Sequence, residues 1–201
     1  MVHFSGIIEK WRNGIHLFIH IQVICDADLI FINIIARWPG SVHDARILRE
    51  SALFRAFESP RKPLNGVFLG DRGYMLRDWL MTPILHPATQ RERNYNFAHS
   101  STRTTVERSI GVAKRRWHCL RTGLRLEPAK ACQVITVCLM LHNRATRLRL
   151  DPPDSDDEEE EDDDTDEEDE GEHPDHEIDP RERARRNAGH AVRQRLMNEY
   201  F

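Results

Sequence analysis

Long apolar runs are missing from this chain of 201 residues. The most apolar region, residues 15–38, is interrupted by Asp26 and Asp28, whereas a membrane-spanning helix needs about 20 consecutive apolar residues. The first 14 residues also lack the charged start, the apolar stretch and the small-residue cleavage site of a secretory signal. We therefore expect neither a membrane span nor a secretory signal.

Cysteine is scarce as well. The four thiols are Cys25, Cys119, Cys132 and Cys138, and none belongs to a CxxC pair. This usage is typical of reduced core thiols in an intracellular protein. Cys132, Cys138 and His142 do not have the spacing of a standard zinc site, so we expect no zinc there.

The net charge of −4 conceals two regions of opposite sign. Residues 1–150 carry 23 Lys and Arg against 11 Asp and Glu, a net charge of +12, and residues 151–201 carry −16. This asymmetry predicts a basic body that meets a polyanion, together with an acidic tail. We expect one domain over residues 1–150, an acidic disordered segment over 151–179 and a short C-terminal helix over 180–201.

Three roles remain open for the acidic segment, which has 20 acidic residues and no Lys or Arg. It is a solvated linker, a competitor of DNA for the basic body, or a binding site for basic nuclear proteins.

Hydrophobic periodicity predicts a mixture of strands and helices in the basic body. Apolar residues and turn signals place strands at 17–25 and 29–36 as a hairpin, and a further short strand at 67–70. The predicted helices cover residues 43–57, with Ser41 as a cap, and residues 74–81, 101–120 and 128–149. This composition favours an α/β sheet domain.

Four carboxylates stand at positions that suit chemistry. Asp71 directly follows the short strand, and Glu107 borders the apolar stripe of the helix over 101–120. Asp44 lies at a helix start and Asp26 at the hairpin, where acids are common for structural reasons. Two or three converging carboxylates bind Mg²⁺ or Mn²⁺, although each of these residues alone also fits a turn or a surface ion pair.

A dense basic patch follows Glu107 along the same helix. Its members on the helix are Arg108, Lys114, Arg115 and Arg116, and Arg121 and Arg125 follow the end of the helix. Such a strip suits contacts with a nucleic-acid backbone, and it equally suits a solvated helix face.

Four ordered motifs resemble the PIF/Harbinger transposase family, which includes the domesticated Harbinger transposase-derived nucleases. They are PGSVHDARILRES, LGDRGYMLRDWLMTPIL, YNFAHSSTRTTVERSIGVAKRRWHCL and CLMLHN, and they extend from about Gln22 to Asn143.

The resemblance implies an RNase H-like DDE nuclease domain that cleaves DNA with a divalent metal cation, Mg or Mn, in the nucleus and with the cytoplasm as a second location. It implies Asp71 and Glu107 as catalytic and metal-binding acids, Asp44 as a further metal ligand, and a structural or accessory Asp26. DNA is the implied partner, and a separate Myb-like DNA-binding protein is a second one.

The chain departs from the family at its start. The family's first catalytic Asp lies in a motif similar to IDGTH, and residues 1–21 contain no Asp. We therefore expect an N-terminally incomplete domain. The alternative function is a catalytically inactive remnant that binds DNA or a nuclear partner.

Overall fold

The computed structural model describes residues 9–13, 17–39, 44–63, 66–153 and 179–201. The acidic residues 154–178 and Ser41, the predicted helix cap, lie outside this part of the chain. The elements, in chain order, are β1 (Glu9–Asn13), β2 (Leu17–Cys25), β3 (Phe31–Pro39), α1 (Asp44–Arg49), α2 (Ala52–Phe57), β4 (Phe68–Leu69), β5 (Leu80–Met81), α3 (Gln90–Arg116), α4 (Cys119–Thr122), α5 (Pro128–Arg147) and α6 (Pro180–Tyr200).

The predicted hairpin is confirmed, and its first strand, β2, is the central strand of the larger sheet. β2 pairs with β3 and also with β1, both antiparallel, in the order β1-β2-β3. Asp26 shapes the hairpin turn, because its Oδ1 accepts hydrogen bonds from the backbone N–H groups of Asp28 and Ile30, each at 3.0 Å. The structure thus gives Asp26 the structural role that the sequence predicted.

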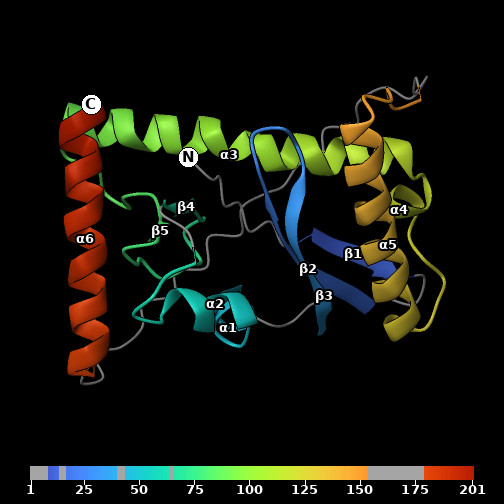
Figure 1. Ribbon diagram of the computed structural model, residues 1–201, viewed down its shortest axis with the longest axis horizontal. Coiled ribbons are helices and arrows are strands. Elements are labelled where there is room, and N and C mark those ends of the chain that lie inside the picture. The colour runs from blue at the N-terminus through green and yellow to red at the C-terminus, as the bar shows by residue number, and fades with distance from the viewer. Residues whose placement is uncertain (1–8, 14–16, 40–43, 64–65, 154–178) are drawn as a thin grey trace.

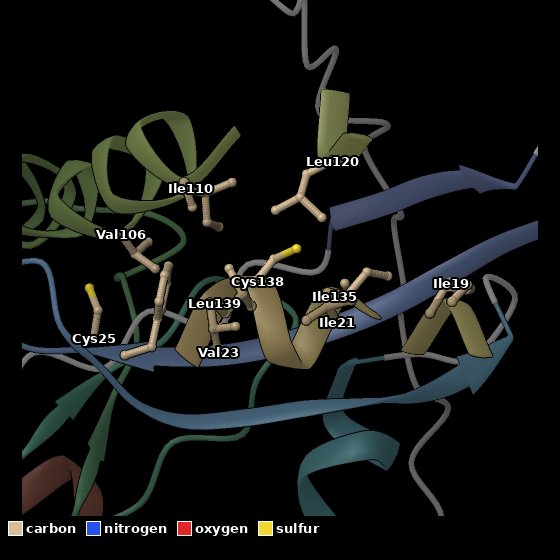
Figure 2. Packing of buried hydrophobic residues seen from close by; sticks show 13 residues of the cluster. Ile19, Ile21, Val23, Cys25, Val106, Ile110, Leu120, Ile135, Cys138 and Leu139 are labelled. Atoms are coloured by element: carbon tan, nitrogen blue, oxygen red, sulfur yellow. The ribbon is translucent and has the colours of Figure 1, made fainter. Parts of the chain in front are cut away.

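Alternate residues of β2 face opposite layers, as the two-residue period of a strand requires. Ile19, Ile21, Val23 and Cys25 point toward α3 and α5, where they join the main hydrophobic core (Figure 2). The helix side of this core includes Val106, Ile110 and Ala113, the apolar stripe expected from the sequence.

The other face of β2 packs against a second cluster. Ile24 contacts residues of α1, α2 and the β4–β5 region, and the amide of Gln22 donates a hydrogen bond to the Tyr74 hydroxyl at 2.7 Å. Since both Gln22 and Tyr74 are buried, this contact fixes the β4–β5 region against the central hairpin.

The single helix predicted over residues 43–57 is wrong in detail. The chain forms two short helices, α1 and α2, separated at Ser51. The Ser51 hydroxyl accepts from the Phe54 N–H at 3.0 Å and donates to the Leu48 carbonyl at 2.6 Å. A serine whose hydroxyl accepts from a backbone N–H in this way favours the start of a new helix at Ser51 over the continuation of α1.

The helix predicted over residues 74–81 is wrong. Leu80–Met81 form β5, which pairs in parallel with β4, and Arg77 and Leu80 close a tight turn through reciprocal backbone hydrogen bonds of 2.9 and 3.2 Å. The Arg77 side chain is only 3% exposed and bonds to Glu58. Burial and ion pairing of this arginine therefore override the local helix propensity.

The helix predicted over residues 101–120 extends further toward its N-terminus and is shorter at its C-terminus. α3 begins at Gln90, where Thr89 and Glu92 form a capping box, and it ends at Arg116 before the separate α4. A capping box satisfies two of the free N–H groups of a helix start, which stabilises this early beginning. α3 consequently runs the length of the molecule, from α6 at one end to α4 and α5 at the other (Figure 1).

The helices expected at 128–149 and 180–201 are present as α5 and α6. α6 packs on α3 and β5, and its Val192 and Leu196 join Leu69, Leu76 and Met81 in a third cluster. Arg77 forms salt bridges with both Glu58, at 3.1 Å, and Glu182 of α6, at 2.6 Å. Within the described residues, no helix is both long and apolar enough to span a membrane.

Candidate active site

Asp71 occupies the turn that follows β4. Its Oδ1 accepts a hydrogen bond from the Gly73 N–H at 2.9 Å, and its backbone carbonyl accepts from the Tyr74 N–H at 3.3 Å. Gly70 precedes it in a tight space, because a Cβ there would lie 3.0 Å from the Tyr74 ring and 3.1 Å from Leu80. The local sequence therefore presents a half-buried carboxylate at the end of a parallel strand pair.

His99 connects this strand pair to α3. Its Nε2 lies 3.2 Å from the Met81 carbonyl, which accepts a hydrogen bond from it at the end of β5. The side chain is buried, and burial lowers the pKa of the imidazole to about 4, against the opposing effect of hydrogen bonds to the backbone of Met81 and Gly70. The neutral ring thus holds α3 beside the residue that precedes Asp71.

Ser109 gives α3 a second point of attachment. Its hydroxyl donates to the Leu29 carbonyl at 2.9 Å, in the β2–β3 turn. Glu107 lies between these two attachments, on the exposed side next to the buried Val106. The part of α3 that carries Glu107 is therefore fixed both to the strand pair that ends at Asp71 and to the central hairpin.

The Leu29 carbonyl also accepts a hydrogen bond from the His142 Nε2 of α5, at 3.0 Å. Asn143, the next residue, accepts from the Phe31 N–H at 2.8 Å and donates to the Phe31 carbonyl at 2.7 Å. These bonds give the end of the CLMLHN motif a structural role, because they attach α5 to the hairpin. His142 is buried, and burial lowers its pKa.

Asp44 is the first residue of α1, and its side chain lies outside the described residues. Among the side chains that are described, no group of three His, Cys, Asp or Glu residues is arranged to hold a metal ion. The oxygen donors of Asp71 and Glu107 suit Mg²⁺ or Mn²⁺ chemically. A three-carboxylate site that includes Asp44 stays a prediction.

The predicted basic strip divides into exposed and engaged residues. Arg108 and Arg115 are exposed on α3, and Lys114 is half-buried. Arg116 donates to the Leu150 carbonyl at 2.8 Å and so holds the chain that follows α5. Of the four members on α3, Arg108 and Arg115 are accordingly the most open to a nucleic-acid backbone; Arg121 and Arg125, beyond the helix, are exposed as well.

The four cysteines are free thiols. Cys25 and Cys138 are buried, and burial raises their pKa values to about 12 and about 11. Cys119 is exposed, so the expectation of a core position is wrong for that residue, which lies at the start of α4.

Sequence reasoning missed the three polar attachments made by His99, Ser109 and the His142–Asn143 pair. Their common signal is a polar residue within or beside an apolar helical stripe, at a position that packing would otherwise assign to an apolar side chain. The partner of each is a backbone group 18 to 113 residues away in the sequence, which periodicity does not identify.

Comparison with known proteins gives a consistent result. The family described as DDE superfamily endonuclease matches residues 10–143. HARBI1 of Mus musculus, named as a nuclease, is 36% identical over 135 residues, and HARBI1 of Homo sapiens is 34% identical over the same length. Each of these matches covers 66% of this chain and 38% of the relative.

A plant relative, named Protein ALP1-like, from Arabidopsis thaliana, is 28% identical over 151 residues, which is 67% of this chain and 37% of the relative. No solved structure matches. The chain spans less than two fifths of the length of these relatives. The matched region extends from β1 into α5 and contains Asp44, Asp71 and Glu107. This chain therefore belongs to the DDE superfamily endonucleases, as a relative of the Harbinger transposase-derived nucleases.

Proposed function

We propose that this domain is a metal-dependent DNA endonuclease with an RNase H-like arrangement, which hydrolyses phosphodiester bonds in the nucleus. The observation that carries the proposal is the double attachment of α3. His99 bonds to the end of β5, beside the strand that leads to Asp71, and Ser109 bonds to the hairpin. Glu107 lies between them on a helix whose position is fixed, as a preorganised catalytic group requires.

The RNase H-like arrangement is supported by the relation of the two sheets. A three-stranded antiparallel sheet is covered by α3 and α5 on one face, and the parallel β4–β5 pair is held against β2 by the Gln22–Tyr74 contact. The acid that ends β4 and the acid on the covering helix belong to neighbouring layers.

Asp71 and Glu107, with Asp44 as a third ligand, are the residues that would hold Mg²⁺ or Mn²⁺. A divalent ion there would neutralise charge on the scissile phosphate and lower the pKa of a water molecule. The chain's own contribution is to orient the two acids, through the Gly73 N–H at Asp71 and the two attachments of α3.

The net charge of +12 over residues 1–150 supports DNA as the substrate, because a basic body attracts phosphates over distances beyond direct contact. Arg108 and Arg115 are exposed on the helix that carries Glu107. Backbone contacts from these side chains would place the duplex beside the two acids. The separate Myb-like partner stays a prediction.

The test is nicking of supercoiled plasmid DNA by the purified full chain in Mg²⁺ and in Mn²⁺. We expect Asp71→Asn and Glu107→Gln to lower the nicking rate at least 100-fold. Asn at position 71 can still accept from the Gly73 N–H, and Glu107 is exposed, so both variants should fold. Glu127→Gln is the matched control, because this exposed glutamate makes no side-chain hydrogen bond as the N-cap of α5.

Absence of nicking by the unchanged chain in either metal would reject the endonuclease proposal. The second candidate is an inactive remnant that binds DNA, and the net charge of +12 over residues 1–150 favours DNA binding whether or not a metal is held. It predicts DNA binding without cleavage and without any effect of Glu107→Gln.

A further inference from the structure

α6 lies outside the region that matches the endonuclease family and is firmly held by the body. Gly189 lies against Arg77, so close that a Cβ would be 2.9 Å from the Arg77 carbonyl carbon. Met197 is buried, and Arg193 donates to the Thr82 carbonyl at 3.2 Å. The helix occupies one end of the molecule, with the rest of the body on one side of it only (Figure 1).

The six arginines of α6 separate into two groups. Arg185 and Arg193 bond to the body, at Glu58 and Thr82. The other four are exposed, and within the described part of the chain no carboxylate forms a salt bridge with them; they are Arg181, Arg183, Arg186 and Arg195. The packing of α6 on the body therefore does not explain the presence of these four arginines.

The outward face of α6 carries small and amide side chains. Asn187, Ala191 and Gln194 are spaced by four and three residues and so share one face, and all three are exposed. The outward face ends before Asn198, whose Oδ1 accepts from Arg91 of α3 at 2.7 Å and from the Gln194 amide at 3.4 Å. By the helical period this face is opposite the one that contains Gly189 and Leu196. Arg183 lies on one border of the outward face and Arg195 on the other.

This pattern matches the dimensions and chemistry of a DNA major groove. An α-helix with its side chains is about 10–12 Å across, and the groove is about 12 Å wide. Arginines on both borders of a helix can reach the phosphates of both strands, and Asn and Gln are the side chains that pair in bidentate fashion with adenine.

We propose that α6 is a DNA-binding helix that lies in the major groove, with its border arginines on phosphates and with Asn187 and Gln194 facing the base edges. The acidic residues 154–178 are the competing occupant, since they are attached directly to the helix. A run of carboxylates would form ion pairs with the arginines but would not require Asn and Gln on the same face. The amide side chains therefore favour DNA over the acidic segment as the occupant. The proposed contacts include neither Asp71 nor Glu107, so DNA binding by α6 can be measured without metal.

The experiment measures equilibrium binding of the full chain to a fluorescent 24-base-pair DNA duplex, in EDTA and over a series of salt concentrations. We expect Arg183→Gln/Arg195→Gln to weaken binding roughly tenfold and to lower the salt slope by about two, one for each lost phosphate contact. Arg49→Gln/Arg61→Gln is the charge-matched control on exposed arginines of the body, and we expect less than a twofold change. Circular dichroism checks that helix content is unchanged.

The amide face is tested by selection from a pool of duplexes with a randomised centre. We expect the unchanged chain to enrich adenine-containing sites and Asn187→Ala/Gln194→Ala to lose that enrichment, whereas Asn94→Ala, on the exposed surface of α3, keeps it. Loss of enrichment with retained overall affinity would separate base contacts from phosphate contacts.

Three outcomes would overturn the proposal. The first is an Arg183→Gln/Arg195→Gln variant that binds as the body control does. The second is tighter DNA binding by that variant, because tighter binding would mean that the arginines hold a different partner. The third is equal competition by double-stranded RNA, whose deep, narrow major groove does not admit a helix. Because binding is measured without metal, these outcomes leave the nicking test of the endonuclease unaffected.

Discussion

Asn143 pairs with Phe31 through both atoms of its side-chain amide. The amide oxygen accepts the Phe31 N–H at 2.8 Å, and the amide nitrogen donates to the Phe31 carbonyl at 2.7 Å. One side chain of α5 thereby satisfies both backbone groups of the first residue of β3. Together with the His142 bond to Leu29, it fixes the hairpin turn to a helix more than 100 residues away in the sequence.

Asn143→Ala should consequently destabilise the domain. It leaves two partly buried backbone groups of Phe31 without their partner, and each such loss costs about 1–3 kcal/mol when water cannot replace the bond. We expect the free energy of unfolding, measured by urea denaturation, to fall by about 2 kcal/mol. Asn94→Ala on the exposed face of α3 is the control, and an equal loss there would contradict this role of Asn143.

His99 should make the free energy of unfolding decrease at acidic pH. Its pKa is lowered to about 4 in the fold by burial and by the nearby Arg103 and Arg193, whereas an unfolded histidine titrates near 6.5. The folded state thus favours the neutral ring, and stability is lost as the pH falls from about 6.5 toward 4. The full effect is roughly 3 kcal/mol.

The measurement is the free energy of unfolding at pH 7.0 and pH 4.5 for the unchanged chain and for His99→Gln, which can still donate to Met81. We expect the variant to lose less stability between the two pH values. His86→Gln, at an exposed site, is the control for the substitution itself. A His99→Gln profile parallel to that of the unchanged chain would show that His99 does not titrate in this range.

Two helical glycines should respond in opposite directions to alanine. Gly189→Ala places a Cβ 2.9 Å from the Arg77 backbone and should force α6 away from β5, at a cost of about 1–3 kcal/mol. Gly111→Ala in α3 meets nothing within 4 Å and should raise stability by about 1 kcal/mol, through helix propensity alone. Urea denaturation of both variants gives the two values, and stabilisation by Gly189→Ala would disprove close docking of α6.

Leu29→Gly should stabilise the hairpin turn. Leu29 has φ of 62°, in the left-handed region where a Cβ costs about 1–2 kcal/mol. Its carbonyl, which accepts from Ser109 and His142, is unaffected by the substitution. We expect a gain of about 0.5–1 kcal/mol in thermal or urea denaturation. A loss of more than 1 kcal/mol would mean that the half-buried leucine side chain contributes more than the backbone strain removes.

Segments with a clear apolar period were predictable from the sequence. β2, β3 and α5 lie close to their expected positions, and Val106, Ile110 and Ala113 form the expected stripe. The start of α3 at Gln90 was missed by the helix predicted over residues 101–120, although Thr89 and Glu92 have the spacing of a capping box. The stretch YMLRDWLM was not predictable, since its fate depends on the pairing of Leu80 with Phe68 and on the burial of Arg77.

The site was predictable only in its composition. Asp71 and Glu107 can be identified by their place next to a strand and on an amphipathic helix, and their roles as metal ligands stay predictions. The groups that position them are not visible to a periodic pattern, because His99 and Ser109 bond to backbone carbonyls in separate parts of the chain. Such contacts follow from packing between elements rather than from local preference.

The docking of α6 also makes the molecule divisible. The contacts of α6 with Arg77, Glu58 and Thr82 are made by side chains and do not depend on a continuous backbone. A cut in the chain within residues 154–178 should therefore leave α6 bound to the body. Residues 1–153 and a separate peptide of residues 179–201 should then reassemble as two pieces. The number of acidic residues between α5 and α6 can accordingly change without disturbing the fold, and the two fragments should complement each other in solution.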